Sequence, residues 1–155
     1  MHTTMSQEDL FSLPINPKIE PDYIDGKIIP FLNEHKHLIY DLYFTTRMPP
    51  FMQDAMGDVF RGTGDAQAAI KNAFYIRDKT GLPLSATFNN IWVKPDQKNL
   101  EEFITNFKFL YDNGVRIATI PHTSWVMTGQ IQKEYPELKI KNTILREVSK
   151  PNEIV

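Results

Sequence analysis

The stretch TGLPLSATFNNIWVKPDQKNLEEFITNFKFLYDNGVRIATIPH, from Thr80 to His122, decides the fold. Its apolar first part predicts a buried strand over Leu82–Asn90. Asp96–Gly114 has helical spacing and ends on a glycine, and Val115–His122 predicts a second strand. This order, with short connections, predicts a βαβ unit with parallel strands. The predicted apolar face of the helix consists of Leu100, Phe103, Ile104, Phe107 and Leu110.

The rest of the chain continues the alternation of strands and helices. Further strands are predicted over Leu10–Asn16, His37–Thr46 and Leu138–Glu147. Further helices are predicted over Pro21–His35, Asp65–Gly81 and Ser124–Pro136. Pro30 predicts a break or kink in the first of these helices, because proline has no N–H to donate. Asp65 is expected to cap the second helix and Gly81 to end it.

This pattern predicts an α/β fold, for which two architectures remain open. One is a partial (β/α) TIM-type barrel with about five parallel strands, and the other is a small doubly wound open sheet. No G-x-G-x-x-G follows the first strand, which disfavours a dinucleotide-binding Rossmann domain. We expect residues 1–155 to form a single domain that is the amino-terminal portion of a larger barrel. In such a barrel, Phe88 and Ile120 are expected to point inward.

The composition narrows the class of protein. The chain has 155 residues, a net charge of -2 and no block of lysine and arginine, which disfavours a dedicated nucleic-acid surface. With 0 cysteines it has no disulfide, thiolate metal site or cysteine-bound cluster, and we expect no cofactor. The N-terminus has no signal-peptide pattern and no apolar run reaches membrane-spanning length. A cytoplasmic protein without a membrane partner is therefore expected.

Polar residues follow the predicted strands, and the carboxyl ends of parallel strands are where α/β proteins bind ligands. His122 is the candidate for proton chemistry, because an unperturbed histidine titrates near neutrality. The alternative is that His122 is a hydrogen-bonded loop residue and that Asn89 and Asn90 cap a turn. No complete catalytic set is derivable, and no metal site is expected. The residues predicted to bind substrate are Arg47, Arg61, Asn89, Asn90, His122 and Arg146.

The long connection from Thr46 to Gly64 is expected to fold over these strand ends as a lid. The stretch MPPFM, Met48–Met52, carries large apolar side chains that favour packing back onto the protein. If the lid forms, Phe51 should be buried. We expect Asn89, Asn90 and His122 to share one cleft with Arg47 or Arg61.

The order and spacing of several pieces resemble the collagenase-like peptidase family, peptidase family U-32. The resemblance is diffuse, extends over most of the chain, and corresponds to the amino-terminal part of that family's barrel. The matching pieces are IYDLYFTT (Ile39–Thr46), FRGTGD (Phe60–Asp65), ATFNN (Ala86–Asn90), LYDNGVRIATIPH (Leu110–His122), EYPELKI (Glu134–Ile140) and KNTILREVSKPNEI (Lys141–Ile154).

The resemblance implies a barrel-type fold with its site at the carboxyl ends of the strands. It also implies peptidase activity and a rim location for Arg61, Asn89 and Asn90. Some branches of the family carry cysteine-ligated iron–sulfur clusters, which cannot be carried over to a chain with 0 cysteines.

Two functions are therefore expected as alternatives. The first is a hydrolase of this family, or a truncated form of it, acting on a small-molecule or peptide substrate. The second is a non-catalytic remnant that binds a ligand or partner through the same rim. Because the alternation stops at SKPNEIV, we expect a barrel fragment that exposes an edge at Leu138–Glu147 and self-associates.

Overall fold

The computed structural model describes residues 10–15, 20–52 and 63–142. The chain divides into two compact units. Unit 1 comprises Met1–Phe44 and Gly62–Ser85, and unit 2 comprises Thr45–Arg61 and Ala86–Val155. The assignment of residues 1–155 to a single domain stays a prediction.

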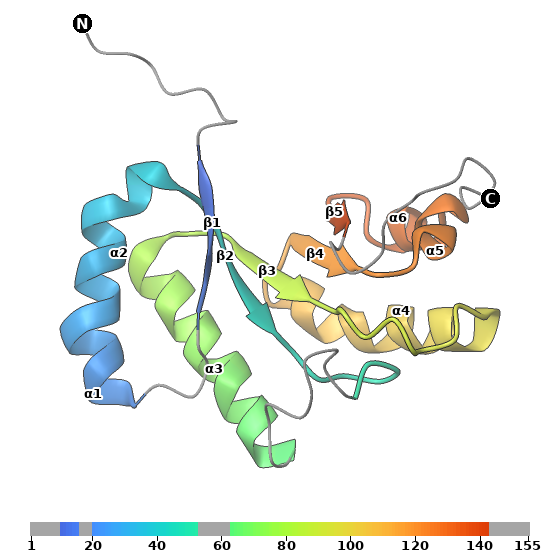
Figure 1. Ribbon diagram of the computed structural model, residues 1–155, viewed down its shortest axis with the longest axis horizontal. Coiled ribbons are helices and arrows are strands. Elements are labelled where there is room, and N and C mark those ends of the chain that lie inside the picture. The colour runs from blue at the N-terminus through green and yellow to red at the C-terminus, as the bar shows by residue number, and fades with distance from the viewer. Residues whose placement is uncertain (1–9, 16–19, 53–62, 143–155) are drawn as a thin grey trace, which may run out of the picture. The chain divides into compact units, whose positions relative to one another are not determined.

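The described strands form one five-stranded parallel sheet, so the predicted α/β fold class is confirmed (Figure 1). The strand order is β1-β2-β3-β4-β5, the same as the chain order. This order has no reversal of the kind that creates the switch point of a doubly wound sheet. It is the order of strands in the wall of a (β/α) barrel and is also consistent with an open sheet. The strands are β1 (Phe11–Pro14), β2 (Ile39–Thr45), β3 (Leu84–Thr87), β4 (Ile117–Ile120) and β5 (Lys139–Asn142).

In unit 1 the first predicted helix is interrupted, as Pro30 predicts. It consists of α1 (Pro21–Tyr23), the π-helical turn η2 (Ile24–Ile28) and α2 (Ile29–His35), followed by the 3-10 turn η3 (Lys36–Leu38). The N–H of Ile29 donates to the carbonyl of Ile24, a π-type bond, directly before Pro30. The wider turn thus comes where proline removes one α-helical hydrogen bond.

The second predicted helix is α3 (Thr63–Thr80), and it ends at Gly81 as predicted. Gly81 has a φ of +74°, a conformation that glycine adopts without steric cost, and its N–H donates to the carbonyl of Arg77 at 2.7 Å. The predicted start was wrong, because the helix begins at Thr63 and Asp65 lies inside its first turn.

In unit 2 the long helix α4 (Gln97–Asp112) is confirmed. The carboxylate of Asp96 accepts the N–H of Asn99 at 2.9 Å, which is an N-cap, and Gly114 with a φ of +87° follows its end. The single helix predicted over Ser124–Pro136 is instead two short ones, α5 (Thr123–Met127) and α6 (Gln130–Glu134). Gly129, with a φ of +72°, separates them.

In unit 2, the packing of Phe88 shows which face of the sheet α4 covers. Its ring packs on Phe103 and Phe107 of α4, with ring centroids 5.1 and 6.1 Å away. The N–H of Phe88 donates to the carbonyl of Thr119 at 2.9 Å, which in a parallel ladder places Phe88 beside Ile120. Phe88 and Ile120 therefore face the helices, and the expectation that they point inward was wrong. Successive strand residues alternate between faces, so a residue's neighbours take the opposite side.

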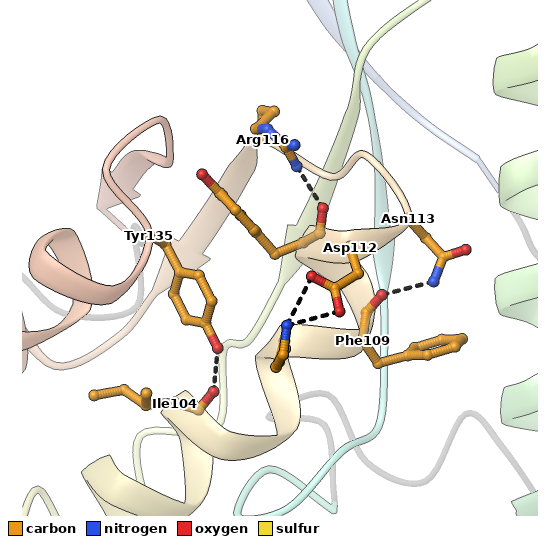
Figure 2. A network of polar contacts seen from close by, with 8 residues as sticks. Ile104, Phe109, Asp112, Asn113, Arg116 and Tyr135 are labelled. Carbon is orange, nitrogen blue, oxygen red and sulfur yellow. Dashed lines mark hydrogen bonds and ion pairs between the residues drawn. The ribbon is translucent and has the colours of Figure 1, made fainter.

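A polar network anchors the end of α4 to the start of β4 (Figure 2). Arg116 donates to the carbonyl of Tyr111 at 2.5 Å, and its guanidinium carbon lies 3.9 Å from the centroid of the Tyr111 ring. On α4 itself, Lys108 and Asp112 form an ion pair at 2.9 Å. Tyr135, directly after α6, donates its hydroxyl to the carbonyl of Ile104. This network lies at the amino end of β4, away from the strand ends where ligands are expected to bind.

Candidate functional site

His122 lies in an aromatic cluster at the carboxyl end of β4. Its side chain is fully buried, and its ring centroid is 4.8 Å from that of Trp125 and 6.1 Å from that of Phe51. Its carbonyl accepts the N–H of Trp125, because His122 is the residue before α5. This environment favours a packing role over proton chemistry. The assignment of His122 as catalytic stays a prediction.

The start of the predicted lid packs back onto the protein, as its apolar residues predict. Phe51 is buried, and its ring lies 5.4 Å from Phe88, 5.9 Å from Phe103 and 5.7 Å from Trp125 between centroids. The N–H of Met48 donates to the carbonyl of Phe51 at 3.1 Å, which closes a tight turn. The loop after β2 is thus joined to the same cluster as β3, α4 and α5. Residues 53–62 lie outside the described residues.

Asn90 holds the turn that follows β3. The strand ends at Thr87, earlier than predicted, so Asn89 and Asn90 lie in the loop. The buried side chain of Asn90 accepts the N–H of Trp92 through Oδ1 at 2.9 Å. This is the turn-capping role that asparagine often has. The turn presents Trp92, whose side chain is 83% exposed.

A row of polar residues crosses the carboxyl ends of the strands on the face opposite α4. The pairing of β4 with β5 places Thr119 directly beside Lys141. The hydrogen bond from Phe88 to Thr119 fixes the register of β3 against β4 and places Thr87 beside Thr119. Because Phe88 faces the helices, Thr87 and its neighbours in the row face away from them.

The row continues onto β2. The N–H of Leu42 donates to the carbonyl of Pro83 at 2.8 Å, and this register, carried to the strand ends, places Thr45 beside Thr87. We call this set the threonine–lysine row; it consists of Thr45, Thr87, Thr119 and Lys141.

Burial supports this assignment of faces. Each member of the row is partly exposed, whereas Phe44, Ala86 and Ala118, which precede three of its members, are buried. The same alternation is visible in the sequence as a threonine or lysine after a small or apolar residue near the ends of β2, β3, β4 and β5. That signal could have identified the row, but it depends on the register between strands, which one sequence does not reveal.

The charge of the row is positive. Lys139 lies on the same face as Lys141, two residues earlier on β5. Among the described strand residues of unit 2, the positions on this face hold no carboxylate, but on β2 the buried Asp41 lies two residues before Tyr43 and four before Thr45, and therefore on this face. Arg47 and Asn89, both predicted as site residues, follow the strand ends at Thr45 and Thr87. An ammonium group beside several hydroxyls is suited to hydrogen-bond an anion.

A hollow lies near the ends of β4 and β5 on the helix side, the face opposite this row. It has a volume of about 180 Å³ and is lined by Ile120, Thr123, Val126, Ile140 and Lys141. This hollow and two others in the described residues, one beside Glu101 and one beside Pro95, are not lined by Asn89, Asn90 or His122. The shared cleft of those three side chains therefore stays a prediction.

Two predicted site residues, Arg61 and Arg146, lie outside the described residues. Within the described ranges, no group of three or more histidine, aspartate or glutamate side chains is placed to hold a metal ion. His35 is stacked on Phe31, with ring centroids 4.5 Å apart. None of the helices in these ranges has the length and apolar character needed to span a bilayer.

Neither a scan against protein-family models nor a search of curated proteins finds a match to this chain. Membership of the collagenase-like peptidase family therefore stays a prediction.

Proposed function

We propose that the protein binds a small molecule or peptide on the face of its sheet opposite α4, at the carboxyl ends of the strands. The threonine–lysine row carries this proposal, because it gathers hydrogen-bonding side chains from four neighbouring strands. Rigid strands fix the positions of such groups better than loops do. Arg47 and Asn89 at the strand ends would extend the same surface.

Binding without catalysis is the form that the geometry supports best. The imidazole of His122 is enclosed by Phe51 and Trp125, and the side chain of Asn90 caps the turn before Trp92. His122 and Asn90, which were predicted from the sequence as site residues, thus have packing and turn-capping contacts. A ligand on the row would meet hydroxyl and ammonium groups instead.

The second candidate is a hydrolase of the collagenase-like peptidase family. The sequential parallel strand order supports it, because that is the order in a (β/α) barrel wall. In this form His122 would be the general acid–base residue, and Arg47, Arg61, Asn89, Asn90 and Arg146 would contact the substrate. For either function we propose a cytoplasmic location, which fractionation of cells would test.

An experiment with fluorescein-labelled gelatin peptides distinguishes the two proposed functions, binding and hydrolysis. For a binding protein, we expect the fluorescence anisotropy of the peptides to rise without cleavage, and the combined substitutions T87V and T119V to weaken binding. Valine keeps the shape of threonine and has a methyl group in place of the hydroxyl. The substitution H122F provides the control, because phenylalanine can replace imidazole in an aromatic cluster.

Cleavage that wild type performs and H122F lacks, with both proteins folded, would favour the hydrolase. If T87V/T119V and wild type bind the peptides equally, the row is not the binding surface.

A further inference from the structure

We propose that the hollow near the ends of β4 and β5 is the docking site for a later segment of this chain, residues 143–155, which inserts Ile154 and Val155. This segment lies outside the described residues. The inference is independent of the proposed function, because the hollow lies on the face of the sheet opposite the threonine–lysine row.

The hollow has the size and the lining of a site for aliphatic side chains. Its walls are Ile120 of β4, Ile140 of β5 and Val126 of α5, and Thr123 and Lys141 complete the lining. Ile120 is buried, whereas Val126 and Ile140 are only partly buried. An aliphatic cavity of about 150 Å³ takes up a benzene molecule, so this hollow of about 180 Å³ can take up an isoleucine side chain.

The topology of unit 2 assigns this position to the segment that follows β5. α4 and the α5–α6 pair lie on one face of the sheet, because Trp125 packs on Phe103 and Tyr135 on Phe107, with ring centroids 5.8 and 5.3 Å apart. The strand order follows the chain order, so each further right-handed connection crosses this same face, one strand further along. The segment after β5 is therefore expected beside α5, where the hollow lies.

The sequence of the segment fits this position. SKPNEIV, Ser149–Val155, has a serine, a proline and a glutamate in the order typical of the start of a helix. Ile154 and Val155 are the apolar residues that follow these signals. β5 ends at Asn142, and an extended chain spans about 3.3 Å per residue, so the segment is long enough to reach the hollow.

Two other occupants of the hollow must be distinguished from this one. The first is the same segment of a second copy, which would join two chains, and the second is a separate ligand or protein. The chain's own segment has an advantage over both, because its attachment to β5 gives it a high effective concentration at the hollow.

Disulfide formation in the full chain tests the contact. The chain has 0 cysteines, so a pair of introduced cysteines reports on one contact alone. We expect V126C/I154C to form an intramolecular disulfide about tenfold faster than M127C/I154C under mild oxidation. Met127 is the matched control, because it is the next residue of α5, is 58% exposed and does not line the hollow.

Thiol labelling gives a second test that does not require disulfide geometry. In V126C, the added substitutions I154D and V155D should raise the rate of labelling by a maleimide about tenfold, because carboxylates are costly to bury in an aliphatic hollow. The matched substitutions K150D and N152D place two carboxylates at polar positions of the same segment and should leave the rate unchanged.

Three results would overturn the docking of this segment. Equal oxidation rates of the two cysteine pairs would show that Ile154 does not lie beside Val126. A disulfide-linked dimer as the main product, seen by electrophoresis without reducing agent, would assign the hollow to a second copy. A labelling rate of V126C that I154D/V155D leaves unchanged would show that the segment does not cover the hollow.

Discussion

Histidine and asparagine are common in functional sites, but here the side chain of His122 packs in an aromatic cluster and the side chain of Asn90 caps a turn. The position of each near a strand end could be predicted from the sequence, because the strand and helix patterns are clear. The burial of His122 could not be predicted, because it depends on a contact with Phe51, which is distant in sequence. The cap that Asn90 forms is local, and the sequence allowed it as an alternative.

The two tryptophans of the chain provide a test of this local structure. Trp92 is exposed on the turn held by Asn90, whereas Trp125 is buried in the aromatic cluster. We expect acrylamide to quench W125F, which retains Trp92, several-fold more strongly than W92F, which retains Trp125. The emission of W125F should also lie at longer wavelength. Similar quenching of both variants would contradict the placement of Trp125.

Tyr135 gives the protein an alkaline pH dependence. Burial, and secondarily the charge of Glu134, raises the pKa of Tyr135 from 10.0 to about 12. The folded state therefore favours the neutral phenol, and this contribution to stability is fully present below pH 10 and lost as the pH rises towards 12. We expect the free energy of unfolding to fall by about 2 kcal/mol over this interval.

Urea denaturation at several pH values measures this fall. The variant Y135F should lack that part of the pH dependence, whereas Y111F, at a neighbouring and more exposed ring, should retain it. An unchanged alkaline fall in Y135F would refute the assignment to Tyr135.

At the scale of elements, the βαβ unit from β3 to β4 follows from the sequence. The apolar spacing of α4, its Asp96 cap and the glycine after its end are all local signals, and all three are observed. The strands β2, β3 and β4 were predicted too long, because apolar character continues into loops that are buried by other segments. The predicted end of the last strand, at Glu147, lies outside the described residues. The division between α5 and α6 was missed, since the helical spacing continues across Gly129.

Gly129 should be needed for this division. Its φ of +72° lies in the left-handed region, where a Cβ costs about 1–2 kcal/mol. We expect G129A to lower the free energy of unfolding by that amount. Gly26 in the π-helical turn is the matched control, because a Cβ there meets nothing within 4 Å and its φ is not positive.

G26A is expected to be neutral or to stabilise the protein by up to about 1 kcal/mol. Thermal and urea unfolding of the two variants measures the difference. Equal stability of G129A and wild type would contradict the left-handed turn.

At the scale of the whole molecule, the strand order links the fold to the proposed site. The parallel sheet and its class could be predicted from the alternation of elements. The row could not be, because its members come from four strands whose register is set by backbone pairing rather than by any motif. Parallel sheets are usually covered on both faces, and the partly exposed polar side chains opposite α4 are the reason for the binding role that we propose.

The edge of the sheet at β5 leads to a prediction about association. An edge strand has backbone N–H and carbonyl groups that can pair with a second chain, and only Lys139 and Lys141 oppose this on the described strand. We expect concentration-dependent self-association in sedimentation experiments, increased in K139V/K141V. A monodisperse monomer for both proteins would show that this edge is not open.

Thr87 and Thr119 lie side by side in one row on the face opposite α4, and the proposed binding function depends on this placement. The chain has 0 cysteines, so T87C/T119C can be labelled with nitroxides at these two positions alone. Because neighbouring strands lie about 4.8 Å apart, the electron paramagnetic resonance spectrum should show strong dipolar broadening. A spectrum equal to the sum of the two singly labelled proteins would contradict the register and, with it, the row.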